Sequence, residues 1–365
     1  MKAAWLKNGA IEWRDGLPEP AREEGLELEV LLAGICGTDL QLLRGYAGFE
    51  GIPGHEFVAR ISDPGEVEAL LAPRHDHSHG ASSRARRARL ASPPVGDWER
   101  RRVVAEINVP CSECPSPSPA CARHCPLRSV VGIRGRQGAL AQRMRLPACN
   151  LHPVSDHLSD QAAVFCEPLA AALQVQEAVR VAPHESVLVV GAGRLGQLIA
   201  RVLAPLGCRL RVAAKHPSHV RRLEAQGIEP LSPQDVPVSR FEVVVEATGS
   251  PAGLQAALAA VRPRGRIVLK STYADGAAGR AGGDAEPEPR DPGLAANLDL
   301  TQIVVDEIQL VGSRCGPFAP ALRLLESGRI DPRDLVDEVV DMDRVAEAFE
   351  KASRPGALKI LLRPS

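Results

Sequence analysis

The chain has 365 residues, of which 44% are hydrophobic and 24% charged, and its formal net charge is −1. This length is sufficient for two domains, each with its own core. The near-neutral charge excludes a general attraction to nucleic acid or to an anionic membrane. The sequence has no apolar run of about 18 residues, and its opening stretch, MKAAWLKNGAIEW, lacks the apolar core of a signal peptide. We therefore expect a cytoplasmic protein with no nucleic-acid or membrane partner.

The first 60 residues carry short apolar runs of alternating pattern, broken by glycine and proline. Examples are LELEVLLAGIC and EFVARI. Such runs are typical of a β-rich domain with many loops.

From about residue 160 the pattern changes to strands that alternate with helices. Strands are expected at 186–190, 209–214, 241–248 and 266–271, and helices at 194–207, 218–227 and 253–261. This alternation predicts right-handed βαβ units and a parallel sheet. The chain ends with a helix at 345–353 and a strand at 357–363, too few elements for a domain of their own. We expect them to rejoin the N-terminal domain.

Two stretches, at about 64–95 and 274–293, interrupt this organisation. Both are rich in small, polar and charged residues and lack apolar periodicity, so we expect surface loops. The first contains His75, His77 and His79, but nothing in the pattern would hold them in place as metal ligands.

A glycine-rich motif follows the strand at 186–190 and opens the next helix. It reads VLVVGAGRLGQL, and we predict that its loop binds a dinucleotide through Gly191, Gly193, Arg194, Leu195 and Gly196. The first glycine permits a tight turn, the second lets the backbone approach a pyrophosphate, and the third permits close helix–strand packing.

The end of the next strand bears on which dinucleotide is bound. An acidic residue there would hold the free ribose hydroxyls of NAD(H). This chain instead has Lys215 and His216, and a lysine attracts a 2′-phosphate. NADP(H) is therefore favoured, although NAD(H) remains possible.

Three further motifs carry residues that can bind a metal. They are GICGTDL at 34–40, GHEF at 54–57 and FCEPLAAALQ at 165–174. Together they offer the thiolate of Cys36, the imidazole of His55 and the carboxylate of Glu167. Three protein ligands with one open position are typical of a catalytic zinc site.

The motifs GICGTDL, GHE, EPLAAAL, GAGRLG and EATGS, in this order, resemble the medium-chain dehydrogenase/reductase family. The resemblance is strongest to its zinc-dependent branch of alcohol, sorbitol and threonine dehydrogenases. It covers almost the whole chain except the two inserts. It implies an α/β fold with a GroES-like β-rich catalytic domain and a Rossmann domain with a doubly wound parallel sheet. The expected limits are 1–155 for the catalytic domain, 156–316 for the Rossmann domain and 317–365 for a C-terminal segment that returns to the catalytic domain. It also implies a homodimer or homotetramer, formed through the edge strand near IQLVGS.

The resemblance assigns roles to the metal motifs. Cys36 and His55 would bind the catalytic zinc, and Glu167 would bind it directly or through water. Glu56 is a direct ligand in the polyol-dehydrogenase-like members, whereas in other members it lies behind the ligands and does not touch the zinc. Asp39 would orient His55 by binding its other ring nitrogen.

The resemblance also implies a path for the substrate proton. Thr38 matches the hydroxyl that receives this proton. The histidine that ends the relay in many alcohol dehydrogenases is replaced by Gln41, which cannot take a proton. The proton would then leave through water or another group, with Glu56 as a candidate.

Four further positions are expected at the cofactor cleft. Thr248 and Gly249 would line the adenosine side, with a strand-to-helix cap as the alternative for Thr248. Ser271 would lie near the nicotinamide. Arg314 would reach the cofactor ribose or pyrophosphate, with a surface salt bridge as the alternative.

A cluster of cysteines, CSECPSPSPACARHCP at 111–126, matches the family's structural-zinc lobe with one change. Three cysteines keep the family spacing, whereas Pro117 replaces the third and a cysteine appears four residues later. Because zinc needs four tetrahedral ligands in any order, we expect a rearranged structural zinc. Its ligands would be Cys111, Cys114, Cys121 and Cys125, with His124 as the reserve ligand. The alternative is a loop that is empty of metal or partly oxidised.

The sequence therefore predicts a zinc-dependent, NAD(P)-linked oxidoreductase that interconverts an alcohol or polyol and its ketone or aldehyde. One alternative is a zinc-free quinone or enoyl reductase on the same fold. A second is a non-catalytic NADP-binding sensor or scaffold.

Overall fold

The structure, a computed structural model, describes residues 1–62, 101–111, 123–272 and 300–364. Both expected inserts lie outside these described residues, as do Cys114 and Cys121.

One sheet consists of six parallel strands in the order β12-β11-β10-β13-β14-β15. Their bounds are β10 Ser186–Val190, β11 Arg209–Ala213, β12 Glu229–Leu231, β13 Phe241–Glu246, β14 Val261–Leu269 and β15 Gln309–Gly312. Val187, Leu188 and Val189 of β10 are fully buried, as expected for a central strand covered on both faces. The strand order reverses between β10 and β13, which places a ligand crevice at the carboxyl ends of these strands.

The helices of this half alternate with its strands. Their bounds are α6 Cys166–Val179, α7 Arg194–Leu203, α8 Pro217–Ala225, α9 Pro251–Ala260 and α10 Leu300–Val305. The predicted strands and helices between 186 and 271 are confirmed, with shifts at their ends. For example, α7 ends at Leu203 because Pro205 cannot continue the helical hydrogen bonds.

The second sheet has the strand order β16-β17-β3-β4-β5-β9, with β8 also paired to β3. Its bounds are β3 Leu26–Gly34, β4 Glu56–Ile61, β5 Arg102–Ala105, β8 Arg143–Leu146, β9 Leu151–Pro153, β16 Val336–Asp341 and β17 Lys359–Arg363. Along β3, Leu26, Leu28 and Val30 are buried while the residues between them are more exposed, as the alternating sequence LELEV predicts. The C-terminal strand β17 pairs with β3, with Leu361 opposite Gly34.

Shorter elements complete the part of the chain that the structure describes. They are β1 Ala3–Lys7, β2 Ala10–Arg14, β6 Asn108–Val109, β7 Ser129–Val130, α1 Gly37–Leu43, α5 Asp160–Ala163, α11 Phe318–Glu326 and α12 Val345–Ser353.

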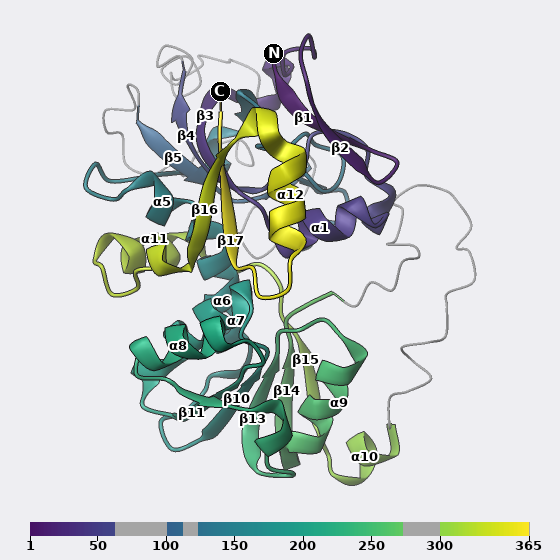
Figure 1. Ribbon diagram of the computed structural model, residues 1–365, viewed down its shortest axis with the longest axis vertical. Helices are drawn as coiled ribbons and strands as arrows, with labels where there is room; N and C mark the ends of the chain where they lie inside the picture. The colour runs from purple at the N-terminus through teal and green to yellow at the C-terminus, as the bar shows by residue number, and fades with distance from the viewer. Residues whose placement is uncertain (63–100, 112–122, 273–299, 365) are drawn as a thin grey trace, which may run out of the picture.

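The two sheets lie at opposite ends of the molecule, with α6 and α7 between them (Figure 1). The yellow C-terminal strands β16 and β17 lie beside the purple β3, so both ends of the chain belong to the same half. The domain limits at 155 and 316 stay a prediction. Among the described residues, no helix has the length and apolar character needed to cross a membrane.

Candidate active site

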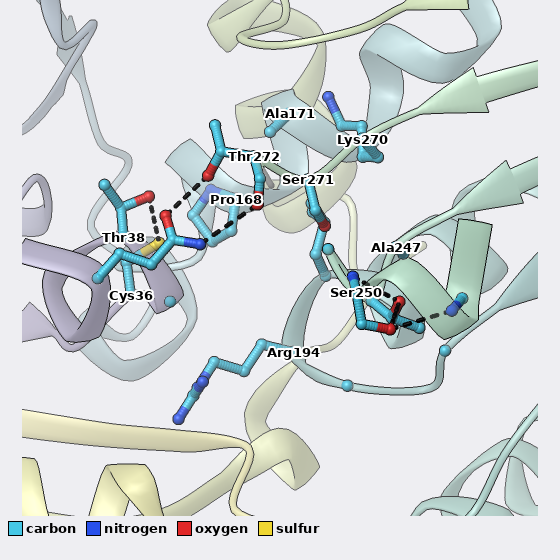
Figure 2. Close-up of a pocket in the computed structure, with 18 of the residues that line it drawn as sticks. Cys36, Thr38, Pro168, Ala171, Arg194, Ala247, Ser250, Lys270, Ser271 and Thr272 are labelled. Carbon is cyan, nitrogen blue, oxygen red and sulfur yellow. Dashed lines mark hydrogen bonds between the residues drawn. The ribbon is translucent and has the colours of Figure 1, made fainter. Parts of the chain in front are cut away.

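A cavity of about 1400 Å³ lies between the two halves. Cys36 and Thr38 line it from the half with β3, whereas Gly191, Gly193 and Lys270 line it from the parallel sheet. Figure 2 shows Cys36 and Thr38 on one side of the cavity and Lys270 and Ser250 on the other.

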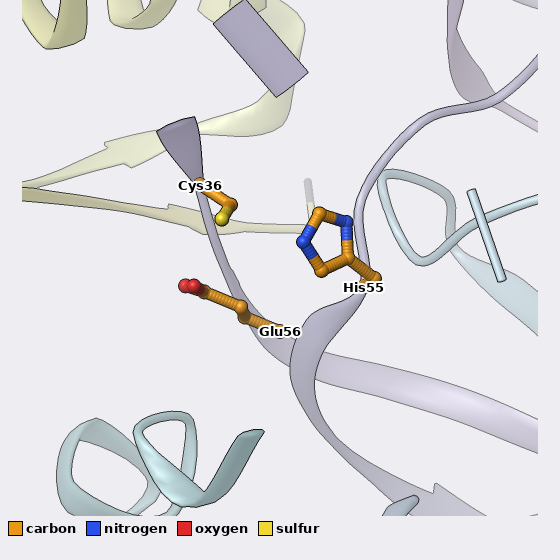
Figure 3. A group of neighbouring side chains, drawn as sticks. All are labelled: Cys36, His55 and Glu56. Carbon is orange, nitrogen blue, oxygen red and sulfur yellow. The ribbon is translucent and has the colours of Figure 1, made fainter. Parts of the chain in front are cut away.

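Three side chains that can bind a metal lie together at this cavity. Cys36 is the residue before α1, while His55 and Glu56 stand at the start of the neighbouring strand β4 (Figure 3). Their ligand atoms all lie within 4.8 Å of one another, and His55 and Glu56 are 2% and 1% exposed. A thiolate, an imidazole and a carboxylate at this separation fit Zn²⁺.

Asp39 connects the two motifs that supply these side chains. One carboxylate oxygen accepts a hydrogen bond from the Cys36 amide at 2.8 Å, and the other accepts one from the Gly54 amide at 3.2 Å. His55 Nδ1 lies 3.5 Å from the second oxygen, which leaves the other ring nitrogen for a metal. Burial alone would lower the pKa of His55, but the adjacent Asp39 and Cys36 outweigh it and raise this pKa well above its usual value.

Glu56 has a partner that sequence analysis missed. Its carboxylate forms an ion pair with the amine of Lys359, which is 2% exposed. The Lys359 amine also lies 3.4 Å from the Ile35 carbonyl oxygen and 5.6 Å from the centre of the Phe165 ring. The only sequence signal was one lysine within the apolar strand ALKILLR.

Glu167 lies in the first turn of α6 and lines the same cavity, but it is not part of the compact group of Cys36, His55 and Glu56. Burial raises the pKa of Glu167 to about 7, and Glu56 adds to this shift. Its predicted role as a ligand, direct or through water, stays a prediction.

The predicted proton path begins beside this group. Thr38 Oγ1 lies 3.8 Å from Cys36 Sγ. Gln41 is bound across the cavity to Thr272, whose hydroxyl donates to the Gln41 side-chain oxygen at 2.7 Å. Gln41 thus joins α1 to the segment after β14.

The glycine-rich loop has the geometry that a dinucleotide requires. Gly191 has a φ of 101°, which favours glycine. A Cβ atom on Gly196 would lie 1.9 Å from the Gly191 carbonyl oxygen, so the close packing of α7 on β10 needs glycine there. A Cβ on Gly193 would meet open space, which leaves room for a pyrophosphate at the N-terminus of α7.

Arg194 and Leu195 of this loop line the cavity. The Arg194 guanidinium donates hydrogen bonds to the carbonyl oxygens of Ala352 and Leu358. It therefore ties the loop to the C-terminal segment.

At the adenosine side, Lys215 is exposed on the cavity and His216 precedes α8. His219, which sequence analysis missed, also lines the cavity. Its ring lies 5.1 Å from that of His216, and its Nε2 lies 3.0 Å from the Gly356 carbonyl oxygen. Burial lowers the pKa of His219.

The loop after β13 is organised by a buried carboxylate. Glu246 accepts hydrogen bonds from the amide and hydroxyl of Thr248 and from the amide of Gly249. Ser250, not Thr248, caps α9, since its hydroxyl accepts from the Gly253 amide at 3.0 Å. Thr248 lines the cavity, as does Ser271.

The segment after β15 contacts the other half of the molecule. Arg314 donates to the Asn108 side chain at 2.7 Å and to the Arg123 carbonyl oxygen at 2.9 Å. The Lys270 amine donates to the Arg314 carbonyl oxygen and to Ser313 Oγ, and burial lowers the pKa of Lys270 to about 8. The predicted contact of Arg314 with the cofactor stays a prediction.

Of the predicted structural-zinc ligands, Cys111 and Cys125 are described, and their sulfur atoms lie 3.5 Å apart. Two thiolates on one tetrahedral zinc lie about 3.8 Å apart. The separation is therefore compatible with a shared metal, while Cys114 and Cys121 lie outside the described residues.

Curated relatives match the chain along nearly its whole length, although no protein-family model matches it. The chain is 26% identical to D-arabinitol dehydrogenase 1 of Uromyces fabae, with 93% of this chain and 89% of the relative covered. It is 27% identical to erythritol/L-threitol dehydrogenase of Mycolicibacterium smegmatis, with 95% and 92% covered. It is 25% identical to L-galactonate-5-dehydrogenase of Escherichia coli K12, with 92% and 89% covered.

Solved structures share the fold over the full chain. The alcohol dehydrogenase TADH of Thermus sp. ATN1 is 26% identical, with a TM-score of 0.73 and 100% of both chains covered. A zinc-binding dehydrogenase of Sinorhizobium meliloti 1021, solved with NADP, is 21% identical, with a TM-score of 0.76 and 100% and 99% covered. The predicted fold class, a Rossmann sheet with a GroES-like β-rich domain, is confirmed. The relatives and structural neighbours named here are thus dehydrogenases, of polyols, a sugar acid or alcohols where the substrate is named, and one solved structure is that of a zinc-binding dehydrogenase.

Proposed function

We propose that this protein is a zinc-dependent, NAD(P)-linked oxidoreductase that interconverts an alcohol or polyol and its ketone or aldehyde. The observation that carries this function is the shared cavity. Cys36, His55 and Glu56 gather on one side of it, and the loop with Gly191, Gly193 and Gly196 lies on the other.

The named relatives support an oxidoreductase of this kind. Two of them are named for polyols and one for a sugar acid, and all match over about nine-tenths of their length. A polyol therefore fits better than a simple alcohol as the general substrate class.

A zinc ion bound by Cys36, His55 and Glu56 would act as a Lewis acid on the substrate oxygen, and a bound nicotinamide would exchange hydride with the adjacent carbon. Asp39 holds the His55 ring and the Cys36 amide in place. Thr38, whose hydroxyl lies 3.8 Å from Cys36 Sγ, would accept the substrate proton.

The proton must then leave Thr38 by a path without histidine. Gln41 has no titratable group, and its side chain is occupied by Thr272. Solvent in the cavity is the simplest acceptor, because the cavity is large enough to admit both substrate and water.

We favour NADP(H) as the cofactor. Lys215 stands on the cavity directly after β11, with no carboxylate among the next described residues up to Glu224. A lysine there attracts a 2′-phosphate. The expected measurement is a lower KM for NADP than for NAD, and a Lys215→Ala variant that reduces this preference.

The zinc-free reductase on the same fold is less compatible with the group of Cys36, His55 and Glu56, in which three side chains that can bind a metal lie together. A sensor or scaffold would bind the dinucleotide without turnover. Metal analysis and turnover of a panel of polyols and secondary alcohols separate these functions.

We expect bound zinc and NADP-linked turnover in the wild type, and loss of both catalytic zinc and turnover in Cys36→Ser. Cys149→Ser is the matched control, because Cys149 is exposed and lies outside the metal group. Unchanged turnover in Cys36→Ser would exclude the zinc-dependent reaction. The cytoplasmic location, the second zinc and the homo-oligomer also belong to this proposal.

A further inference from the structure

Besides Arg194 of the glycine-rich loop, three arginines line the cavity without a carboxylate partner among the described residues. Arg128 and Arg134 stand on either side of β7, and Arg314 follows β15 on the parallel sheet. None of the three has an acidic group within 4.0 Å in the part of the chain that the structure describes. The cavity wall therefore carries positive charge that nothing described neutralises.

Neutral oxygen atoms hold two of these guanidinium groups in place. Arg128 donates to the Cys125 carbonyl oxygen at 3.0 Å, and Arg314 donates to Asn108 and to the Arg123 carbonyl oxygen. Such contacts orient the groups but leave their charge uncompensated.

The third arginine is fixed through its backbone. Val130 and Arg134 exchange two hydrogen bonds, of 2.8 and 2.9 Å, which close the turn after β7. Arg128 and Arg134 thus stand at the two ends of one short, closed segment.

The three charges lie close enough to act on one another. The pKa of Arg128 is lowered, first by burial and then by the charges of Arg314 and Arg134. In addition, the Nε atom of Arg128 is buried with no hydrogen-bond partner among the described residues. A group of like charges held together in this way is more stable when an anion lies among them.

The position of Arg128 and Arg134 separates these two residues from the cofactor phosphates. A pyrophosphate belongs at the N-terminus of α7, and a 2′-phosphate belongs beside Lys215 after β11. Arg128 and Arg134 come from the opposite half, on a segment whose strand β7 pairs with β6. Val130 and Ile133 of this segment also line the cavity, which gives the wall around the arginines an apolar part.

We propose that Arg128, Arg134 and Arg314 form an anion subsite that binds a carboxylate or phosphate group on the substrate. The substrate class is then an acidic polyol, such as a sugar acid or a polyol phosphate, rather than a neutral polyol. This inference rests on the proposed dehydrogenase function. A guanidinium group binds either oxyanion through paired hydrogen bonds, so both chemistries must be tested.

The first experiment compares kcat/KM for matched neutral and anionic substrates. Pentitols and hexitols are assayed beside their aldonates and their terminal phosphates, and the selectivity is the anionic-to-neutral ratio. We expect Arg128→Gln to lower this ratio by roughly tenfold or more, because a charge-assisted hydrogen bond is lost. Arg128→Lys should retain part of it. Arg264→Gln is the control for net charge, since the Arg264 side chain is 82% exposed and does not line the cavity.

The second experiment does not depend on turnover. Inorganic phosphate and the preferred aldonate should raise the Tm of the wild type at saturating NADP(H), and raise it less in Arg128→Gln. The saturating cofactor excludes a shift that arises from phosphate in the cofactor site.

The outcomes test the anion subsite and the dehydrogenase function separately. If neutral alcohols turn over but the ratio and the Tm shifts are equal in wild type and Arg128→Gln, the anion subsite is wrong and the dehydrogenase stands. If Arg128→Gln instead weakens NADP(H) binding, the cluster serves the cofactor and the substrate assignment is overturned. If no alcohol turns over, the proposed function fails, while the Tm shifts still test the anion site.

Discussion

Glu56, a member of the proposed metal group, forms a buried ion pair with Lys359. Both side chains are 2% exposed, so removing one partner leaves an uncompensated charge in the interior. We expect Lys359→Met to lower the free energy of unfolding by about 3 kcal/mol. The measurement is denaturant unfolding of the metal-free protein, in which no zinc can replace the lysine as the partner of Glu56.

Two further variants make this result specific. The double variant Glu56→Gln/Lys359→Met should recover most of the lost stability, because no lone charge remains. Lys351→Met is the control for a solvent-screened ion pair, and its pairs with Glu338 and Glu347 should contribute much less than the buried pair does. If Lys359→Met and Lys351→Met lose the same free energy of unfolding, the buried pair stabilises the fold no more than the exposed pairs do.

The buried amine of Lys270 has a pKa closer to neutral pH than that of an ordinary lysine. Its pKa is lowered by burial to about 8, below the ordinary lysine value of 10.5, so the folded state binds this proton more weakly than the unfolded state. The folded state is therefore most stable, as far as Lys270 is concerned, above pH 10.5, where the amine is neutral in both states. It loses this stability as the pH falls from 10.5 through 8. Between pH 9.5 and 7.5 the wild type should lose about 2 kcal/mol relative to Lys270→Met.

Denaturant unfolding of both proteins at the two pH values measures this difference. A direct readout is available because the chain has only six lysines. In the NMR spectrum of the ¹³C-methylated protein, one lysine signal should titrate near pH 8, and it should be absent from Lys270→Met. Normal titration of every lysine would contradict the expected burial of this amine.

At the scale of elements, the loop between β10 and α7 distinguishes residues needed for the fold from residues needed for the ligand. A Cβ on Gly196 would collide with the Gly191 carbonyl oxygen, whereas a Cβ on Gly193 would meet open space. We expect Gly196→Ala to lower both stability and cofactor affinity. Gly193→Ala should leave the Tm unchanged and weaken NADP(H) binding at least tenfold, because the methyl group occupies space that the pyrophosphate needs.

Thermal unfolding and fluorescence titration with NADPH measure the two effects. If Gly193→Ala binds the cofactor as tightly as the wild type, the pyrophosphate does not lie at the N-terminus of α7.

The elements that sequence predicted well are those set by short-range patterns. The parallel strands and their helices follow from apolar runs, and the site residues Cys36, His55 and Glu56 lie in compact motifs. The role of Asp39 beside His55 was implied by the family resemblance, not by a pattern in the sequence.

The contacts that sequence missed join residues far apart in the chain. Lys359 lies 303 residues from Glu56, and Thr272 lies 231 residues from Gln41. Each depends on which sheets and helix ends the fold brings together, and no local periodicity encodes this. Lys270 gave no signal either, because its burial depends on the segment with Ser313 and Arg314 after β15.

At the scale of the whole molecule, the parallel sheet ends in an exposed edge. Among the described strands β15 pairs only with β14, and Leu310 on it is 37% exposed. Nearby α10 exposes Leu300, Val304 and Val305 by 61%, 75% and 73%. An apolar edge of this kind invites pairing with another strand, and a second copy of β15 related by a two-fold axis would cover it.

We therefore expect the wild type to be at least a dimer at micromolar concentration, and the double variant Val304→Lys/Leu310→Lys to be a smaller species. Light scattering after size exclusion measures both masses. Val238→Lys is the matched control, because Val238 is 73% exposed but precedes β13 and lies away from this edge in sequence. Charges on an edge strand prevent pairing, so an unchanged mass in the double variant would place the interface elsewhere. A monomeric wild type would exclude an interface through β15.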